Sequence, residues 1–98
     1  MSKLEITNFD IAQYLDDKEV IAEYLSQILS DGNTDELLEA LGNIAKAKGM
    51  SQLAKDTGLG RESLYKTFQK GTKPKFETIK KVLDSFGVKI QVLAWKIY

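Results

Sequence analysis

Arg61, Tyr65 and Gln69 recur every four residues, a spacing that places their side chains on one face of a helix. An arginine can hydrogen-bond guanine, a glutamine can hydrogen-bond adenine, and an aromatic ring can contact the methyl group of thymine. Glu62 and Lys66 belong to the same outward surface, although their i,i+4 spacing is also typical of an ordinary surface ion pair. The pattern predicts a row of side chains that contact bases in the major groove of duplex DNA.

Polar and basic residues around this row are expected to contact phosphates. Two of them lie at the predicted N-terminus of the preceding helix, where unpaired N–H groups attract anions. The others lie in the loop after the row, where lysine and threonine side chains can donate hydrogen bonds to phosphate oxygens. The predicted phosphate contacts are Ser51, Gln52, Lys70, Thr72, Lys73 and Lys75.

A helix-turn-helix motif would position both sets of side chains. Ala54 is small enough for two helices to cross there, and Gly58, four residues later, allows the positive φ that the turn requires. Leu59 then fills the core beneath the turn, while Leu64 and Phe68 anchor the second helix. The predicted helix-turn-helix core is Leu53, Ala54, Gly58, Leu59, Leu64 and Phe68. A helical hairpin in which alanine and glycine only permit close packing is the alternative.

The spacing of apolar residues predicts the remaining helices. Asp10 can cap a short helix at residues 11–15, and a longer helix is expected at 17–30. The next helix begins at Asn33, where Glu36 completes a capping-box pattern, and Gly49 ends it. The helix-turn-helix contributes helices at residues 51–57 and 61–69, and a last helix covers residues 76–86.

After residue 87 the hydrophobic period changes to strict alternation, which is typical of a β-strand. The predicted strand residues are Val88, Ile90 and Val92. A single strand needs a neighbour for its backbone groups. That neighbour could be residues 4–7 or the same strand of a second molecule, and we favour the second molecule. A homodimer would also help to cover the apolar residues of the tail, which are Trp95, Ile97 and Tyr98.

The expected fold is mainly α, a five- to six-helix domain with a lambda-repressor-like helix-turn-helix and a short C-terminal β-strand. A chain of 98 residues suffices for one domain with one core. We divide it into an acidic N-terminal helical extension (1–32), a DNA-binding helical core (33–87), and a C-terminal strand and tail (88–98).

The net charge is zero, but positive and negative charges are segregated along the chain. Residues 1–40 contain two basic and ten acidic residues, a charge of −8, whereas residues 41–98 contain twelve basic and four acidic residues, a charge of +8. This asymmetry is typical of a protein with a basic face for a polyanion and an acidic face for another partner. Two solvated surfaces of different composition would give the same pattern.

Histidine and cysteine are absent, which removes the usual zinc ligands, the usual neutral-pH general base, and nucleophiles of the Ser–His or Cys–His kind. We therefore expect no enzyme, no metal and no cofactor. No apolar run approaches the ~18–20 residues that span a bilayer. The first residues contain no apolar stretch fit for a signal peptide, so a cytoplasmic protein without membrane contact is expected.

The chain resembles the Xre/Cro-type helix-turn-helix family, and more closely the addiction-module antidote (antitoxin) proteins of the HigA-like kind. The motifs that carry this resemblance are residues 9–17, 21–25, 40–54, 58–66 and 75–83. Two departures from the family pattern concern the second helix of the motif. Gly60 stands where the family usually has a serine N-cap, and Thr67 stands at a position that is often apolar.

The resemblance implies an antitoxin that binds a small toxin of the RelE/ParE-like superfamily and represses their shared operon. Its implied partners are operator DNA, the cognate toxin and a second copy of the chain. An acidic N-terminal half is compatible with a toxin that is itself basic because it handles RNA. The alternatives are a phage Cro-like repressor without a toxin, and a protein-interaction module that no longer binds DNA.

Overall fold

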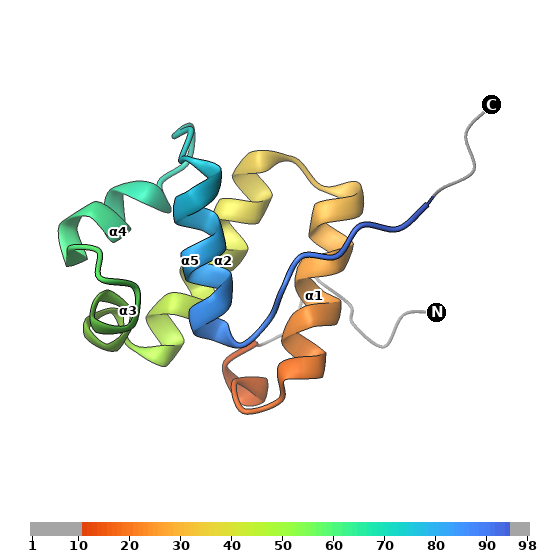
Figure 1. The fold of residues 1–98 in the computed structure, drawn as a ribbon, viewed down its shortest axis with the longest axis horizontal. Helices are drawn as coiled ribbons and strands as arrows, with labels where there is room; N and C mark the ends of the chain where they lie inside the picture. The colour runs from red at the N-terminus through yellow and green to blue at the C-terminus, as the bar shows by residue number, and fades with distance from the viewer. Residues whose placement is uncertain (1–10, 95–98) are drawn as a thin grey trace.

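The computed structural model describes residues 11–94, and over these residues the chain forms a short 3₁₀ helix followed by five α-helices (Figure 1). The elements are η2 (Ile11–Tyr14), α1 (Lys18–Asp31), α2 (Thr34–Lys48), α3 (Met50–Thr57), α4 (Arg61–Thr67) and α5 (Phe76–Phe86). The mainly helical fold is confirmed, and the observed ends of α1 to α5 lie within two residues of the predicted ones. None of the described helices is long and apolar enough to cross a membrane.

The first two long helices begin at side-chain caps. Asp17 accepts hydrogen bonds from the backbone N–H groups of Glu19 and Val20, at 3.1 and 3.2 Å. Asn33 and Glu36 form the predicted capping box, because each side chain accepts from the backbone N–H of the other residue. These bonds satisfy N–H groups that the first turn of a helix leaves without a partner. The starts of α1 and α2 are therefore fixed by local sequence.

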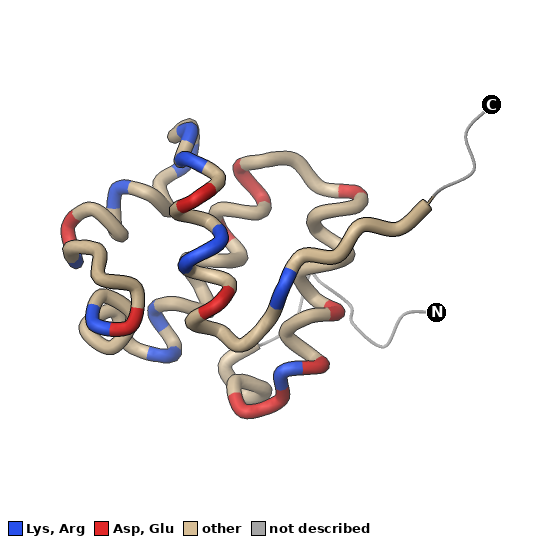
Figure 2. The backbone as a smooth tube through the Cα atoms, in the orientation of Figure 1, with Lys and Arg blue, Asp and Glu red and all other residues tan. Residues whose placement is uncertain are grey.

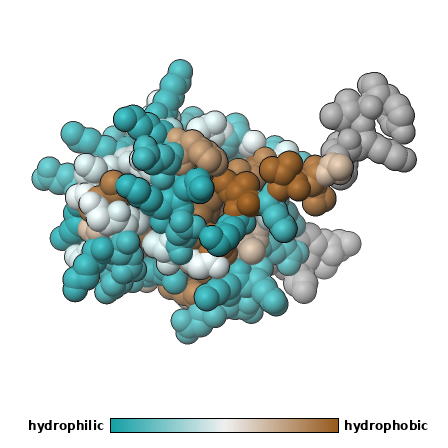
Figure 3. Space-filling model, viewed as in Figure 1, coloured by the Kyte–Doolittle hydropathy of each residue, from teal (hydrophilic) through white to brown (hydrophobic). Residues whose placement is uncertain are grey.

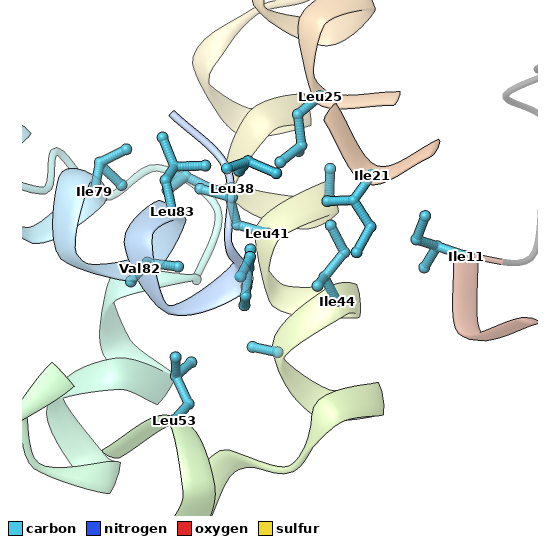
Figure 4. Close-up of a cluster of buried hydrophobic side chains, with 14 of the residues drawn as sticks. Ile11, Ile21, Leu25, Leu38, Leu41, Ile44, Leu53, Ile79, Val82 and Leu83 are labelled. Carbon is cyan, nitrogen blue, oxygen red and sulfur yellow. The ribbon is translucent and has the colours of Figure 1, made fainter. Parts of the chain in front are cut away.

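Helix α2 links the N-terminal elements to the rest of the domain, because it contacts η2 and α1 as well as α3. Figure 4 shows its Leu41 and Ile44 between side chains of α1 and side chains of α5. Ile21 of α1, Leu41, Ile44 and Val82 are fully buried. No polar or charged side chain is buried among the described residues. The core thus joins α1, which comes from the acidic half of the chain, to the helices of the basic half.

The predicted C-terminal strand does not form within the residues that the structure describes. Val88, Ile90 and Val92 lie in an extended chain that runs beside α1 (Figure 1), and no β-strand occurs within residues 11–94. Val88 is buried, but Ile90 is 42% and Val92 is 94% exposed. The physical reason is that a strand requires a ladder partner, and residues 11–94 of one chain provide none. Asp10, residues 4–7, and the tail residues Trp95, Ile97 and Tyr98 lie outside the described residues.

Candidate nucleic-acid interface

Helices α3 and α4 are joined by a three-residue turn that contains Gly58 and Leu59. Gly58 has a φ of +74°, the left-handed conformation that its position in the sequence predicts. Its N–H group donates to the carbonyl of Ala54, which ends α3, and the N–H of Leu59 donates to the hydroxyl of Thr57. Leu59 is half-buried against the core, as predicted. This turn sets the direction in which α4 leaves α3.

Helix α4 divides into an inward and an outward side. Leu64 is fully buried and holds the helix to the core. All five residues predicted to contact bases are exposed, and these are Arg61, Glu62, Tyr65, Lys66 and Gln69. The helix ends at Thr67, two residues earlier than predicted, so Gln69 lies in the following turn. The predicted row therefore consists of two residues on the helix and one just beyond it.

Arg61 and Tyr65 interact with each other on the outward side of α4. The guanidinium carbon of Arg61 lies 5.9 Å from the centre of the Tyr65 ring, which is within the range of a cation–π contact. Such a contact restricts both side chains to a shared orientation. The pair exposes the planar guanidinium group of Arg61, a hydrogen-bond donor, together with the aromatic ring of Tyr65.

The N-terminus of α3 carries the first two predicted phosphate contacts, Ser51 and Gln52. Both are exposed, and no side chain caps this helix, because its N-cap is Gly49. The first-turn N–H groups of α3 are therefore free of side-chain partners. The amide nitrogen of Gln52 donates to the carboxylate of Asp56 at 2.8 Å, so it must exchange this partner before it can bind a phosphate.

The loop after α4 carries the other predicted phosphate contacts. Lys70, Lys73 and Lys75 are exposed. The Thr72 hydroxyl lies 2.9 Å from the carbonyl oxygens of both Thr67 and Gln69, to which it donates. Because a hydroxyl has one proton, Thr72 fixes the loop in this structure rather than offering a donor to phosphate.

Two contacts of this region were not predicted from the sequence. The carboxylate of Asp35, in the first turn of α2, accepts a hydrogen bond from the N–H of Gly71 at 2.8 Å. A Cβ atom built at Gly42 of α2 would lie 3.2 Å from the Cβ of Phe68, so the end of α4 packs closely against α2. An isolated glycine within a helix signals such an approach, whereas nothing in the sequence signals the bond between Asp35 and Gly71.

Comparison with known proteins identifies the family. A family model described as "Probable addiction module antidote protein" matches residues 5–94. The chain belongs to this family. An uncharacterized protein of Haemophilus influenzae (strain ATCC 51907 / DSM 11121 / KW20 / Rd) is 41% identical over 88 residues, which cover 90% of this chain and 91% of the relative. No solved structure matches the chain. Membership of the antidote family supports an antitoxin role with a cognate toxin as partner.

The charges of this antidote protein are separated in space as well as in sequence. Figure 2 shows acidic residues along η2 and α1 and most of the basic residues over α3, α4, α5 and the loop before α5. Among the described residues before position 41, Lys18 is the one basic side chain. The surface around α4 is therefore the electropositive part of the molecule, which favours a polyanionic ligand.

Proposed function

We propose that this antidote protein is a sequence-specific DNA-binding antitoxin, in which α3 and α4 form a helix-turn-helix and α4 enters the major groove. The observation that carries the proposal is the two-sided character of α4. Leu64 is fully buried on one side, while the paired side chains of Arg61 and Tyr65 are exposed on the other. Arginine is the residue that most often contacts guanine specifically in the major groove, so Arg61 is assigned the central base contact.

The surroundings of α4 support phosphate binding on both of its flanks. The uncapped N-terminus of α3 offers backbone N–H groups on one flank. The loop that contains Lys70, Lys73 and Lys75 offers ammonium groups on the other. The bond from Gly71 to Asp35 holds that loop against α2. Phosphate contacts on the two flanks would fix the angle at which α4 meets the bases.

We further propose that the protein acts as a homodimer on an inverted-repeat operator. Val92 is 94% exposed in the extended chain after α5, and pairing of this chain with that of a second molecule would cover it and satisfy backbone groups. Two copies of α4 would then enter major grooves about 34–36 Å apart. Sedimentation that gives a monomer, at concentrations well above those needed to bind DNA, would refute this part of the proposal.

As an antitoxin, the protein would neutralise a toxin of the RelE/ParE-like superfamily and repress the operon that encodes both. We propose no catalytic role, because the sequence has neither histidine nor cysteine, and we propose a cytoplasmic location. A reading frame for a small basic protein directly beside the gene would support the proposal of a toxin partner. A gene isolated within a prophage control region supports a Cro-like repressor instead.

DNA binding is tested with the DNA upstream of the protein's own gene at two salt concentrations, with unrelated DNA as competitor. Arg61→Ala should reduce the preference for operator over unrelated DNA by about 5- to 150-fold, the range expected for one bidentate base contact of ~1–3 kcal/mol. Lys73→Ala should weaken binding to all DNA and lower the salt slope by about one. Lys18→Ala, an exposed lysine at the start of α1, is the matched control and should change neither quantity.

Two outcomes of this experiment would contradict the proposal. If Arg61→Ala leaves the operator preference unchanged, the assignment of α4 as the base-contacting helix is wrong. If the wild-type protein ignores its upstream DNA, the experiment is repeated with the product of the neighbouring gene added. Failure under both conditions means that the protein is an interaction module that does not bind DNA.

A further inference from the structure

An apolar groove of 840 Å³ lies between α1 and the extended chain that follows α5. Its apolar wall is formed by Ala22, Leu25 and Leu29 of α1, Leu83 of α5, and Ile90 and Leu93 of the extended chain. Figure 3 shows the hydrophobic surface continuing along this chain. No residue of α3 or α4 lines the groove, so a partner bound in it would leave the proposed DNA surface free.

Exposed apolar residues gather at the groove and on the extended chain that forms one of its walls. Leu29 is 47% exposed, Ile90 is 42% exposed and Leu93 is 71% exposed. With Val92 of the same extended chain, they make four of the seven large exposed hydrophobic residues among residues 11–94. Contiguous exposed apolar surface of this kind marks an interaction site more often than isolated apolar residues do.

The rim of the groove on the α1 side is acidic. Glu19 and Glu23 are exposed, and each lies three residues before a groove-lining residue of α1, Ala22 and Ser26 respectively, so each is a neighbour of the groove wall on the helix surface. Asp31 lines the end of the groove at the C-terminus of α1. The opposite wall carries Lys89, the one basic residue among those that line the groove. The rim therefore favours a partner whose apolar contact residues are flanked by lysine or arginine side chains.

We propose that this groove binds the cognate toxin, through an apolar segment with basic neighbours that meet Glu19 and Glu23. The proposal rests on the antitoxin function proposed above. A second copy of this chain fits the groove less well, because its own groove offers one basic residue, Lys89, to meet the acidic rim. The dimer contact proposed above pairs the backbones of two extended chains and covers Val92, which does not line the groove.

The test compares binding of the purified product of the neighbouring gene to the full-length protein and to four variants. Leu29→Glu and Leu93→Asp place a charge in the groove and should each weaken toxin binding at least tenfold. Leu29→Glu, which lies outside the proposed dimer contact, should also leave operator binding unchanged. Tyr65→Glu, an equally exposed apolar position on α4, is the matched control and should weaken DNA binding while toxin affinity stays within twofold. The double variant Glu19→Gln/Glu23→Gln should slow toxin association several-fold and flatten its salt dependence.

The outcomes separate this inference from the function on which it rests. If the wild-type protein does not bind the neighbouring gene product, the toxin function itself fails. If the wild type binds it and both groove variants bind it equally well, the toxin binds elsewhere and the groove assignment is wrong. If Leu29→Glu, which lies outside the proposed dimer contact, becomes a monomer in sedimentation, the occupant is a second copy, which also overturns the proposal. Leu93 lies on the extended chain outside the helical core, so its variant keeps the test valid if Leu29→Glu fails to fold.

Discussion

Gly58, in the turn between α3 and α4, is a residue whose backbone geometry predicts how substitution changes the stability of the protein. Its φ is +74°, yet a Cβ atom built there meets no atom within 4 Å. Gly58→Ala therefore adds backbone strain without a clash, and strain of this kind costs about 1–2 kcal/mol of unfolding free energy. In a domain of this size each kcal/mol lowers the Tm by about 4–8 °C. Gly58→Asn should cost less, because asparagine tolerates the left-handed conformation better than alanine does.

Gly60, two residues later, provides a control substitution that should raise the unfolding free energy, whereas Gly58→Ala should lower it. It has a φ of −72°, which any residue can adopt, and it is the N-cap of α4 without a side-chain hydrogen bond. Gly60→Ser adds an acceptor for a first-turn N–H group and should raise the unfolding free energy by a few tenths of a kcal/mol. Urea denaturation of the three variants measures these differences. If Gly58→Ala is as stable as the wild type, or more stable than Gly58→Asn, the backbone strain assigned to position 58 is wrong.

Three further predictions concern the core, a cap and the response to alkaline pH. Leu64→Ala should lower the unfolding free energy by about 2–5 kcal/mol, because Leu64 is fully buried. Urea denaturation measures this loss, and a smaller value would mean that α4 is loosely packed. Asn33→Ala removes the capping box and should lower the unfolding free energy by about 1 kcal/mol. Asp31→Ala, at an exposed position, should lower it by less than half of that amount. Burial, and then the carboxylate of Glu39, raises the pKa of Tyr24 above its ordinary value. Its contribution to stability should therefore be complete below pH ~10 and be lost as pH rises through the folded-state pKa. Tyr24→Phe should remove this loss, and an unchanged alkaline profile would contradict the assignment.

The helices could be predicted because their signals are local. The capping box at Asn33 and Glu36 joins residues three positions apart, and Gly49 and Gly87 mark helix ends in the sequence itself. The strand at residues 88–92 could not be decided in this way, since alternation indicates which side chains share a face but not whether a partner strand exists. At the early end of α4, the hydroxyl of Thr72, five residues further along the chain, donates to the carbonyl of Thr67, the last residue of the helix.

The candidate DNA surface was predictable to the extent that it follows helical periodicity. Leu64 identifies the inward side of α4, so the exposure of Arg61 and Tyr65 follows from their spacing. The contact between Asp35 and Gly71 joins residues 36 positions apart, and only the packing of α2 against the end of α4 brings them together. Sequence patterns thus identified the residues expected to touch DNA, but not the residue that holds their loop in place.

The separation of charge gives this protein an electric dipole although its net charge is zero. At distances beyond the Debye length of about 8–10 Å, a neutral molecule gains little attraction toward DNA. Within that distance, the electric field of the phosphates would exert a torque on the dipole, which turns the α3–α5 end toward DNA and the α1 end toward solvent. The rate of productive encounter would then depend on rotation as much as on collision. Once bound, the molecule would present an acidic outer surface above the polyanion, where a basic protein is attracted and a second nucleic acid is repelled.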